Sequence, residues 1–299
     1  MTRTGTILTA TDLSPASEAA VARAASLARK SEAARLDLLH VVSVSALQSL
    51  RHAVTGTGAD PEGEVRAAAR EAVEQLAASL ASQGSSVQVH VEIGRPQDEI
   101  LRMADALGCG LIVIGAHGRH FVHQLLFGST AERLLYRAKQ PLLVVKRPDP
   151  GSYREVLVAV DFSECARQAA AAALRLLPDT EVVLFHAVES PFEGHMRFAA
   201  VNEQDLAQHR DMALGEAQAD MVRFVQAVAP DAARVRSRVE YGYPPTLIEA
   251  EVERSQPDLL VMGKHGRSGV EQLLIGSVTS HLVRSAPCDV LIVPESQAP

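Results

Sequence analysis

The sequence predicts an α/β protein made of two tandem copies of a Rossmann-like domain, each a doubly wound, five-stranded parallel sheet. Three observations predict it. Each half holds five short apolar runs, helical patterns separate these runs, and the same series recurs in the second half. Because nearly continuous runs of Val, Ile and Leu suit strands covered on both faces, we expect parallel sheets flanked by helices. The predicted domains are residues 1–147 and 153–299, joined by a polar Pro/Gly segment.

The first strand of each copy ends in an aspartate, and a serine follows two positions later. TILTATDLS places Asp12 and Ser14 there in the first copy, and EVLVAVDFS places Asp161 and Ser163 there in the second. The serine suits the cap of the helix that comes next, and Pro15 suits the first position of that helix. Each copy is therefore expected to pass from its first strand directly into a helix.

The later strands match between the copies in the same order. The third strand differs from the others, because Val87, Val89, Val91 and Ile93 alternate with polar residues, as expected for a half-exposed edge strand. The matching runs are Leu36–Val42 with Val182–Val188 for the second strand, Val91–Pro96 with Val239–Pro244 for the third, Leu111–Gly115 with Leu259–Gly263 for the fourth, and Pro141–Val145 with Asp289–Val293 for the fifth.

Helical periodicity fills the segments between these runs. Val65, Ala69, Val73, Leu76 and Leu80 recur at intervals of three and four, which predicts one buried stripe on a charged helix. The second copy repeats the stripe with Leu206, Ala213, Ala217, Met221, Phe224 and Val228, and further helices are expected at Ser129–Arg137 and Ser277–Arg284.

Glycines and a serine recur at fixed distances after the fourth strand of each copy. GAHGRHFVHQLLFGS begins at Gly115 and GKHGRSGVEQLLIGS begins at Gly263, and both fit G-x2-G-x9-G-[ST]. The first two glycines could simply end a strand and turn the chain, but that reading does not explain the third glycine and the serine. Glycine lets backbone N–H groups approach a ligand, and a helix N-terminus attracts anions. These two segments, Gly115–Ser129 and Gly263–Ser277, are called the glycine phrases below. They predict a phosphate-binding site, the phosphate cradle, in each copy.

The aspartate and the glycine phrase are expected to meet in space. Ligands of doubly wound sheets bind outside the carboxyl ends of the strands, where the strand order reverses. With the order 3-2-1-4-5 this point lies between the first and the fourth strand. Those strands end at Asp12 and Gly115 in the first copy and at Asp161 and Gly263 in the second. The two features thus predict one crevice in each copy.

This pairing resembles the universal stress protein family in its tandem form, and the motif is typical of the ATP-binding branch of that family. The likeness covers residues 4–147 and 153–294 and implies domains with the strand order 3-2-1-4-5. It implies that Asp12 and Asp161 contact the ribose or a phosphate-bound Mg²⁺, and that the backbone beside Val41 and Ala187 reads adenine. The implied phosphate-binding residues are Gly115, Gly118, Gly128, Ser129 and Thr130 in the first copy and Gly263, Gly266, Gly276, Ser277 and Val278 in the second.

The second copy is the nearer match to the family pattern. It carries GSVT at Gly276–Thr279 where the first copy has GSTA, and it has Gly269 where the first copy has the bulky Phe121. Arg119 and Arg267 follow the second glycine of each phrase and could screen phosphate charge or simply be solvated.

Histidines inside the glycine phrases are further candidates for the site. His117 and His265 stand at G-x-H-G, where either the side chain or the backbone alone could meet a phosphate. His117, His120 and His123 are spaced by three, which would align them on a helix but means little on a loop, so we do not predict a metal site from them.

The remaining reactive side chains are interpreted as structural. His40 and His186 stand at the ends of the second strands without a nucleophile that the sequence could pair with them. Cys109, Cys165 and Cys288 are lone and widely separated, which suits buried, reduced thiols in a cytoplasmic protein.

Composition narrows the class of protein. The formal net charge of −7 argues against a nucleic-acid partner, since such surfaces are usually basic. No apolar run approaches the length of a membrane-spanning helix, and Asp12 interrupts the apolar stretch near the start. A cytoplasmic protein is therefore expected.

The leading functional hypothesis is a cytoplasmic stress-response protein that binds ATP and Mg²⁺ and acts as a nucleotide-dependent sensor or regulator, without turnover. Glycines and one hydroxyl are enough to bind phosphate, whereas phosphoryl transfer also needs an oriented nucleophile and additional positive charge. One alternative is a slow ATPase or self-phosphorylating enzyme that uses Ser129 or Ser277. Another is an interaction scaffold whose long segments, Ser43–Pro61 and Val188–Gln204, bind a partner or a hydrophobic ligand.

Assembly is expected through the fifth strands. The family resemblance implies that the PLLVV and DVLIV edges pair between domains, and bare sheet edges favour such pairing. A homodimer of tandem chains is the expected assembly.

Overall fold

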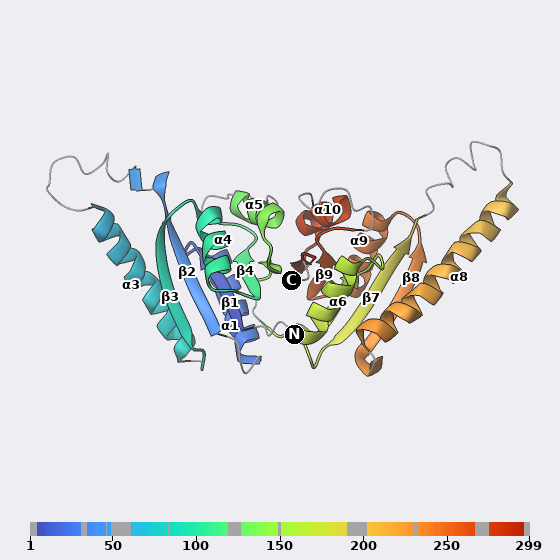
Figure 1. Cartoon of the computed structure of the whole chain (residues 1–299), viewed down its shortest axis with the longest axis horizontal. Coiled ribbons are helices and arrows are strands. Elements are labelled where there is room, and N and C mark those ends of the chain that lie inside the picture. The colour runs from blue at the N-terminus through green and yellow to red at the C-terminus, as the bar shows by residue number, and fades with distance from the viewer. Residues whose placement is uncertain are drawn as a thin grey trace. The chain divides into compact units, whose positions relative to one another are not determined.

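The chain forms two compact units, Met1–Ser152 and Tyr153–Pro299. The computed structural model describes residues 5–30, 35–45, 47–48, 61–82, 84–118, 127–148, 151–189, 202–229, 232–266 and 275–295. In both units strands alternate with helices along the chain, as the sequence predicts (Figure 1).

The first unit contains β1 (Thr6–Thr11), α1 (Pro15–Lys30), β2 (Arg35–Ser43), α3 (Pro61–Ala81), β3 (Val87–Gly94), α4 (Pro96–Ala106), β4 (Leu111–Gly115), α5 (Ser129–Arg137) and β5 (Leu142–Val145). The second unit contains β6 (Glu155–Ala159), α6 (Glu164–Leu176), β7 (Glu181–Val188), α8 (Glu203–Val228), a 3₁₀ turn (Ala232–Arg234), β8 (Val235–Tyr241), α9 (Pro244–Ser255), β9 (Leu259–Gly263), α10 (Ser277–Ser285) and β10 (Asp289–Val293).

Strand pairing in each unit is parallel and follows the predicted order 3-2-1-4-5. In the first unit β1 lies between β2 and β4, with Thr9 opposite Leu38 on one side and Val113 on the other. β3 pairs with β2, and β5 pairs with β4. The second unit repeats this arrangement, because β6 lies between β7 and β9, β8 pairs with β7, and β10 pairs with β9. The strand order therefore reverses between β1 and β4 and between β6 and β9.

Helices cover both faces of each sheet. Right-handed crossovers that move in one direction along a sheet place their helices on one face, and crossovers that move back place them on the other. In agreement with this rule, α6 contacts α8, while α9 contacts α10; in the first unit α4 likewise contacts α5. Figure 1 shows α3 alongside the edge strand β3 and α8 alongside the edge strand β8, and both pairs are in contact.

Burial differs between the strands of the first unit. β4 and β5 are buried along nearly their whole length, whereas most of β3 is half-exposed, which confirms the predicted edge strand. The apolar stripe of α3 is buried at Val73 and Leu80 but only half-buried at Val65 and Ala69. The stripe predicted for the second copy is confirmed at Leu206, Ala217, Met221 and Phe224, which are buried on α8.

The serines after the first strands cap helices as predicted. The Ser14 hydroxyl accepts a hydrogen bond from the backbone N–H of Ser17 at 3.3 Å, and α1 begins at Pro15. The Ser163 hydroxyl accepts one from the N–H of Ala166 at 3.1 Å. Both bonds satisfy donors that the first turn of a helix leaves without a partner.

No helix in the described part of the chain is long and apolar enough to cross a membrane.

An ion pair with a buried carboxylate stabilises the start of β2. The Asp37 carboxylate has 0% exposure and accepts hydrogen bonds from Arg35 Nε at 2.7 Å and Nη2 at 2.8 Å. His90 Nε2, on the neighbouring strand, lies 2.6 Å from Asp37 Oδ1. The hydrogen bond to Asp37 raises the pKa of Arg35 above its ordinary value. A carboxylate so far from water depends on these partners.

Arg35→Met is expected to destabilise the first unit, because it leaves the Asp37 carboxylate buried with a single neighbour. The expected loss in the free energy of unfolding is about 2 kcal/mol. Urea denaturation followed by circular dichroism measures it. Arg236→Met is the matched control, since Arg236 and Glu181 form an ion pair with side chains 72% and 62% exposed; there the expected loss is below about 0.5 kcal/mol. Equal losses in the two variants would contradict the account.

Candidate functional site

Each strand-1 aspartate lies in a tight turn that the next two residues form. Asp161 Oδ1 accepts hydrogen bonds from the Ser163 N–H at 3.0 Å and from the Ser163 hydroxyl at 2.5 Å. In the first unit, Asp12 Oδ1 accepts the same two bonds from Ser14 at 3.1 and 2.5 Å. One oxygen of each carboxylate is thus occupied by the turn, which fixes the direction of the other.

The residue inside each turn adopts a left-handed backbone conformation. Leu13 has a φ of 61° and Phe162 a φ of 64°. Such values are uncommon for residues other than glycine and cost on the order of 1 kcal/mol. The same exception occurs at the same position in both copies, inside the same Asp-x-Ser turn.

The second oxygen of each aspartate faces the glycine loop. A Cβ atom built on Gly266 would lie 2.8 Å from Asp161 Oδ2, and one built on Gly118 would lie 2.7 Å from Asp12 Oδ2. Both distances are shorter than real Cβ contacts, so any side chain at these two positions would displace the carboxylate. The structure therefore brings the aspartate and the glycine phrase together in each copy, at the edge where the sequence analysis places the crevice.

The first glycine of each phrase has a packing role. A Cβ on Gly115 would lie 2.9 Å from the Ala16 carbonyl oxygen, and one on Gly263 would lie 2.9 Å from Cys165 Sγ. Because glycine has no Cβ, the first turn of α1 or α6 can approach the end of the neighbouring strand. This close packing accounts for the glycines at both positions without a ligand.

The third glycine closes the loop through its own amide. The Gly276 N–H donates to the Lys264 carbonyl at 2.9 Å, and the Gly128 N–H donates to the Ala116 carbonyl at 3.0 Å. Each glycine is the N-cap of the following helix, and no side chain caps either helix. The amides of Gly128 and Gly276 are thus used inside the loop, and a bound anion would meet the amides of the next residues.

Those next residues form the open N-termini of α5 and α10. Ser129 and Thr130 begin α5, and Ser277 and Val278 begin α10. The N–H groups of a first helical turn have no partner within the helix and carry its positive dipole end. Since the caps are glycines, no cap side chain covers these N–H groups, which suit an anion.

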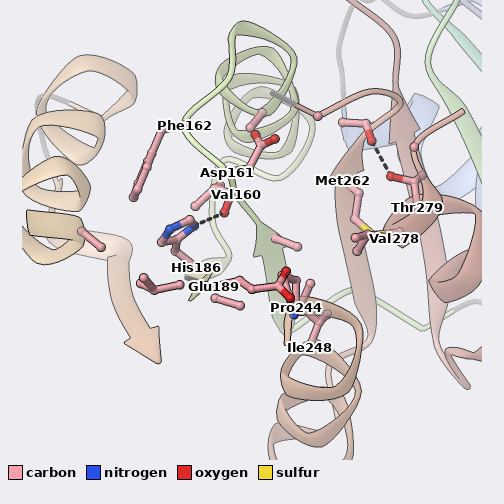
Figure 2. A pocket seen from close by; sticks show the side chains of 18 of the residues that line it. Val160, Asp161, Phe162, His186, Glu189, Pro244, Ile248, Met262, Val278 and Thr279 are labelled. Carbon is pink, nitrogen blue, oxygen red and sulfur yellow. Dashed lines mark hydrogen bonds between the residues drawn. The ribbon is translucent and has the colours of Figure 1, made fainter. Parts of the chain in front are cut away.

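A cavity of about 550 Å³ lies at this point in the second unit (Figure 2). Every residue that the sequence analysis assigns to the second site lines it: Asp161, Ala187, Gly263, His265, Gly266, Gly276, Ser277 and Val278. Figure 2 shows Phe162 and His186 on one side of the cavity and Val278 and Thr279 on the other. The volume is within the usual range for small-molecule sites.

The cavity also contains residues that the sequence analysis did not find. Phe162 follows Asp161, Glu189 follows β7, and Glu216 and Asp220 lie on α8. No motif marks these positions, because α8 reaches the site through packing and not through a fixed spacing. In the sequence they read only as parts of a strand end and a charged helix.

Thr279, the last residue of GSVT, has a role that its sequence context does not predict. Its hydroxyl donates to the Gly263 carbonyl at 2.9 Å, and the residue is 6% exposed. This bond ties the first turn of α10 to the end of β9. The first copy has Ala131 at the equivalent place, so the difference between GSVT and GSTA is the sequence signal for it.

Each strand-2 histidine bonds with a backbone carbonyl oxygen, and His186 also lines the cavity. His40 Nδ1 bonds with the Thr11 carbonyl oxygen at 2.8 Å, and His186 Nδ1 bonds with the Val160 carbonyl oxygen at 2.7 Å. Val41 and Ala187 follow them in β2 and β7. His117 and His265 lie beside the second glycine of each loop, and His265 lines the cavity.

The cysteines are buried free thiols, as predicted. Burial raises the pKa of Cys109 to about 12 and also raises that of Cys165. Cys165 Sγ donates to the Val293 carbonyl oxygen at 3.2 Å. The thiols of Cys109 and Cys165 therefore stay protonated and unreactive at neutral pH.

Other candidate residues lie outside the described part of the chain: Arg119, His120, Phe121, His123, Arg267 and Gly269, with most of the long segments Ser43–Pro61 and Val188–Gln204. Within the described ranges no group of three or more His, Cys, Asp or Glu side chains could hold a metal ion.

Fold and site together define a tandem Rossmann-like protein with a glycine loop at the switch point of each sheet. The model of the universal stress protein family matches residues 4–146 and 152–294, and the chain belongs to this family. A universal stress protein of Mycolicibacterium smegmatis is 25% identical over 305 residues, which cover 96% of this chain and 96% of the relative. A putative universal stress protein of Staphylococcus epidermidis is 28% identical over 153 residues, covering 50% of this chain and 88% of the relative.

Solved structures agree on the fold. The crystal structure of a universal stress protein from Archaeoglobus fulgidus superposes with a TM-score of 0.73 at 21% identity, covering 99% of this chain and 100% of that one. The crystal structure of a putative universal stress protein from Pseudomonas aeruginosa gives a TM-score of 0.64 at 18% identity, with coverages of 97% and 93%.

Thr279→Val is expected to loosen the loop, because it leaves the Gly263 carbonyl without its hydroxyl donor. The expected loss in the free energy of unfolding of the second unit is about 1 kcal/mol. Urea denaturation measures this loss, and hydrogen exchange of the α10 amides locates it. Thr130→Val, at a half-exposed position at the start of α5, is the control; a loss as large there would show that the effect is not specific to the Thr279 bond.

Proposed function

We propose that the chain is a stress-response protein that binds ATP with Mg²⁺ and acts as a nucleotide-dependent sensor or regulator. The observation that carries the proposal is the cavity of the second unit, which all the residues assigned to the second site line together. The Asp161–Gly266 contact places the carboxylate and the glycine loop on the same cavity. Binding there would order the loop and shift a population of conformations that a partner can read.

The phosphate groups are proposed to bind at the N-terminus of α10. The amides of Ser277 and Val278 begin the helix, and the Ser277 hydroxyl adds a further donor. Gly276 as the cap leaves room for an anion, and the helix dipole favours negative charge there. The corresponding turn of α5, at Ser129 and Thr130, offers the first copy the same donors.

The carboxylates of the cavity favour the magnesium complex over free ATP. Asp161, Glu189, Glu216 and Asp220 all line it, and a bare triphosphate would be repelled by them. Asp161 Oδ2 fits a hard cation, which prefers carboxylate oxygen and keeps phosphate oxygens and water as its other ligands. Asp161 and, in the first copy, Asp12 would hold the ion or the ribose, and the ion would neutralise phosphate charge.

The same carboxylates of the described cavity lining support a protein that binds ATP without hydrolysing it. Phosphoryl transfer is accelerated by positive groups on the transferring phosphate and by a base that orients the nucleophile. Among the described lining residues carboxylates outnumber basic side chains, and His186 bonds with a backbone carbonyl. We therefore propose that regulation follows from occupancy of the site.

Asp161→Asn is expected to weaken binding of Mg²⁺·ATP at the second site by about tenfold or more, since one charged interaction is worth about 1.5–3 kcal/mol. The asparagine oxygen can still accept the Ser163 bonds, so the turn should persist. Isothermal titration calorimetry measures the affinity. Asp12→Asn is the matched variant for the first copy, and exposed Asp179→Asn is the control. A wild-type chain that gives no heat and releases no nucleotide after purification would contradict the proposed function.

In single-turnover assays with labelled ATP, the wild-type chain is expected to release no phosphate above the uncatalysed rate and to carry no label on serine. Release that disappears in Asp161→Asn would instead assign hydrolysis to this site. Label on the protein that disappears in Ser277→Ala would favour self-phosphorylation.

A further inference from the structure

A pair of aromatic rings forms one wall of the cavity. The ring of Phe162 lies beside that of His186, with the centroids 4.2 Å apart and the planes tilted by 41°. Both residues line the cavity, and Figure 2 shows them together, away from Val278 and Thr279. Neither ring belongs to the glycine phrase, so the phosphate cradle does not account for them.

Contacts within the protein itself hold the ring pair in place. The Asp-x-Ser turn holds Phe162 at its left-handed φ of 64°. The His186 ring is held by its bond to the Val160 carbonyl at 2.7 Å. Phe224 of α8 lies against Phe162, with ring centroids 5.7 Å apart, and is 8% exposed without lining the cavity. A surface ordered in this way loses little conformational entropy when a flat ligand binds to it.

Charged groups of both signs line the cavity. Glu189 and Glu216 are among its carboxylates, and Ser277 and Val278 present the positive end of α10. An anionic group is therefore favoured at α10 and opposed beside the carboxylates. The aromatic ring pair therefore suits the uncharged part of the same ligand.

The first copy has the same turn without the ring. Leu13 occupies the position of Phe162 with a φ of 61°, and His40 Nδ1 bonds with the Thr11 carbonyl at 2.8 Å as His186 does with Val160. Because the backbone geometry is shared, the two copies differ here in one side chain.

We propose that Phe162, supported by His186, is the base-stacking surface of the second site and makes the two copies unequal in their preference for a nucleobase. The inference rests on the proposed function, because it assigns one part of the same ligand. The second site is then selective for a nucleotide over inorganic polyphosphate, since stacking on an aromatic ring adds affinity only when a base is present. The first site, with Leu13, discriminates less between the two.

Calorimetry with Mg²⁺·ATP and with Mg²⁺·tripolyphosphate tests this assignment. Phe162→Leu, which copies the first site, is expected to weaken ATP binding at the second site by about tenfold and to leave tripolyphosphate binding unchanged. Phe162→Tyr keeps a ring and should restore ATP binding. Leu13→Phe should tighten ATP, but not tripolyphosphate, at the first site. Phe224→Leu, which removes a packed ring outside the cavity, controls for lost core packing and should change ATP affinity far less than Phe162→Leu.

Each other outcome overturns the assignment. Equal loss of ATP and tripolyphosphate binding in Phe162→Leu would show a structural role for the ring, and unchanged ATP binding would show no role in binding. A wild-type chain that binds tripolyphosphate but not ATP would refute base stacking and leave the phosphate cradle intact. A wild-type chain that binds neither would refute the proposed function itself.

Discussion

In each copy one carboxylate connects the first strand, the first helix and the glycine loop. One oxygen of Asp161 accepts two bonds from Ser163, and the other lies against Gly266. The intervening residue, Phe162, has a left-handed conformation, and a Cβ atom at Gly266 would displace the carboxylate. Because these requirements act together, a change at any of the positions alters where the carboxylate points. The loop then closes on the strand end through the Gly276 amide, which sets the helix N-terminus over the cavity.

The two copies share this frame but differ in what surrounds it. Thr279 ties α10 to β9, whereas Ala131 at the same place has no hydroxyl. Lys264 follows the strand end in the second copy, where burial lowers the pKa of its amine, and Ala116 stands there in the first. With Phe162 in place of Leu13, these differences all lie within the site region. The two copies thus share the backbone that positions the carboxylate and differ in the side chains near it.

Local patterns in the sequence were enough to predict the strands, their parallel order, the edge strand β3 and the serine caps, because each depends on burial or on backbone donors close by. The meeting of Asp12 with Gly118 was predicted as well, since strand order alone determines it. The ring pair and the α8 carboxylates were not, because their approach depends on how a long helix packs. The sequence likewise did not reveal that the third glycine uses its own amide, which only the closed loop shows. A homodimer of tandem chains and a cytoplasmic location stay predictions.

A crystal structure of the chain grown with ATP and Mg²⁺ tests the central claim most directly. The account predicts the triphosphate at the first turn of α10, Asp161 Oδ2 on the ribose or the metal ion, and the adenine against the Phe162 ring. A nucleotide bound with its base at α10 and its phosphates beside Glu216, or a cavity filled by the chain's own side chains, would contradict it.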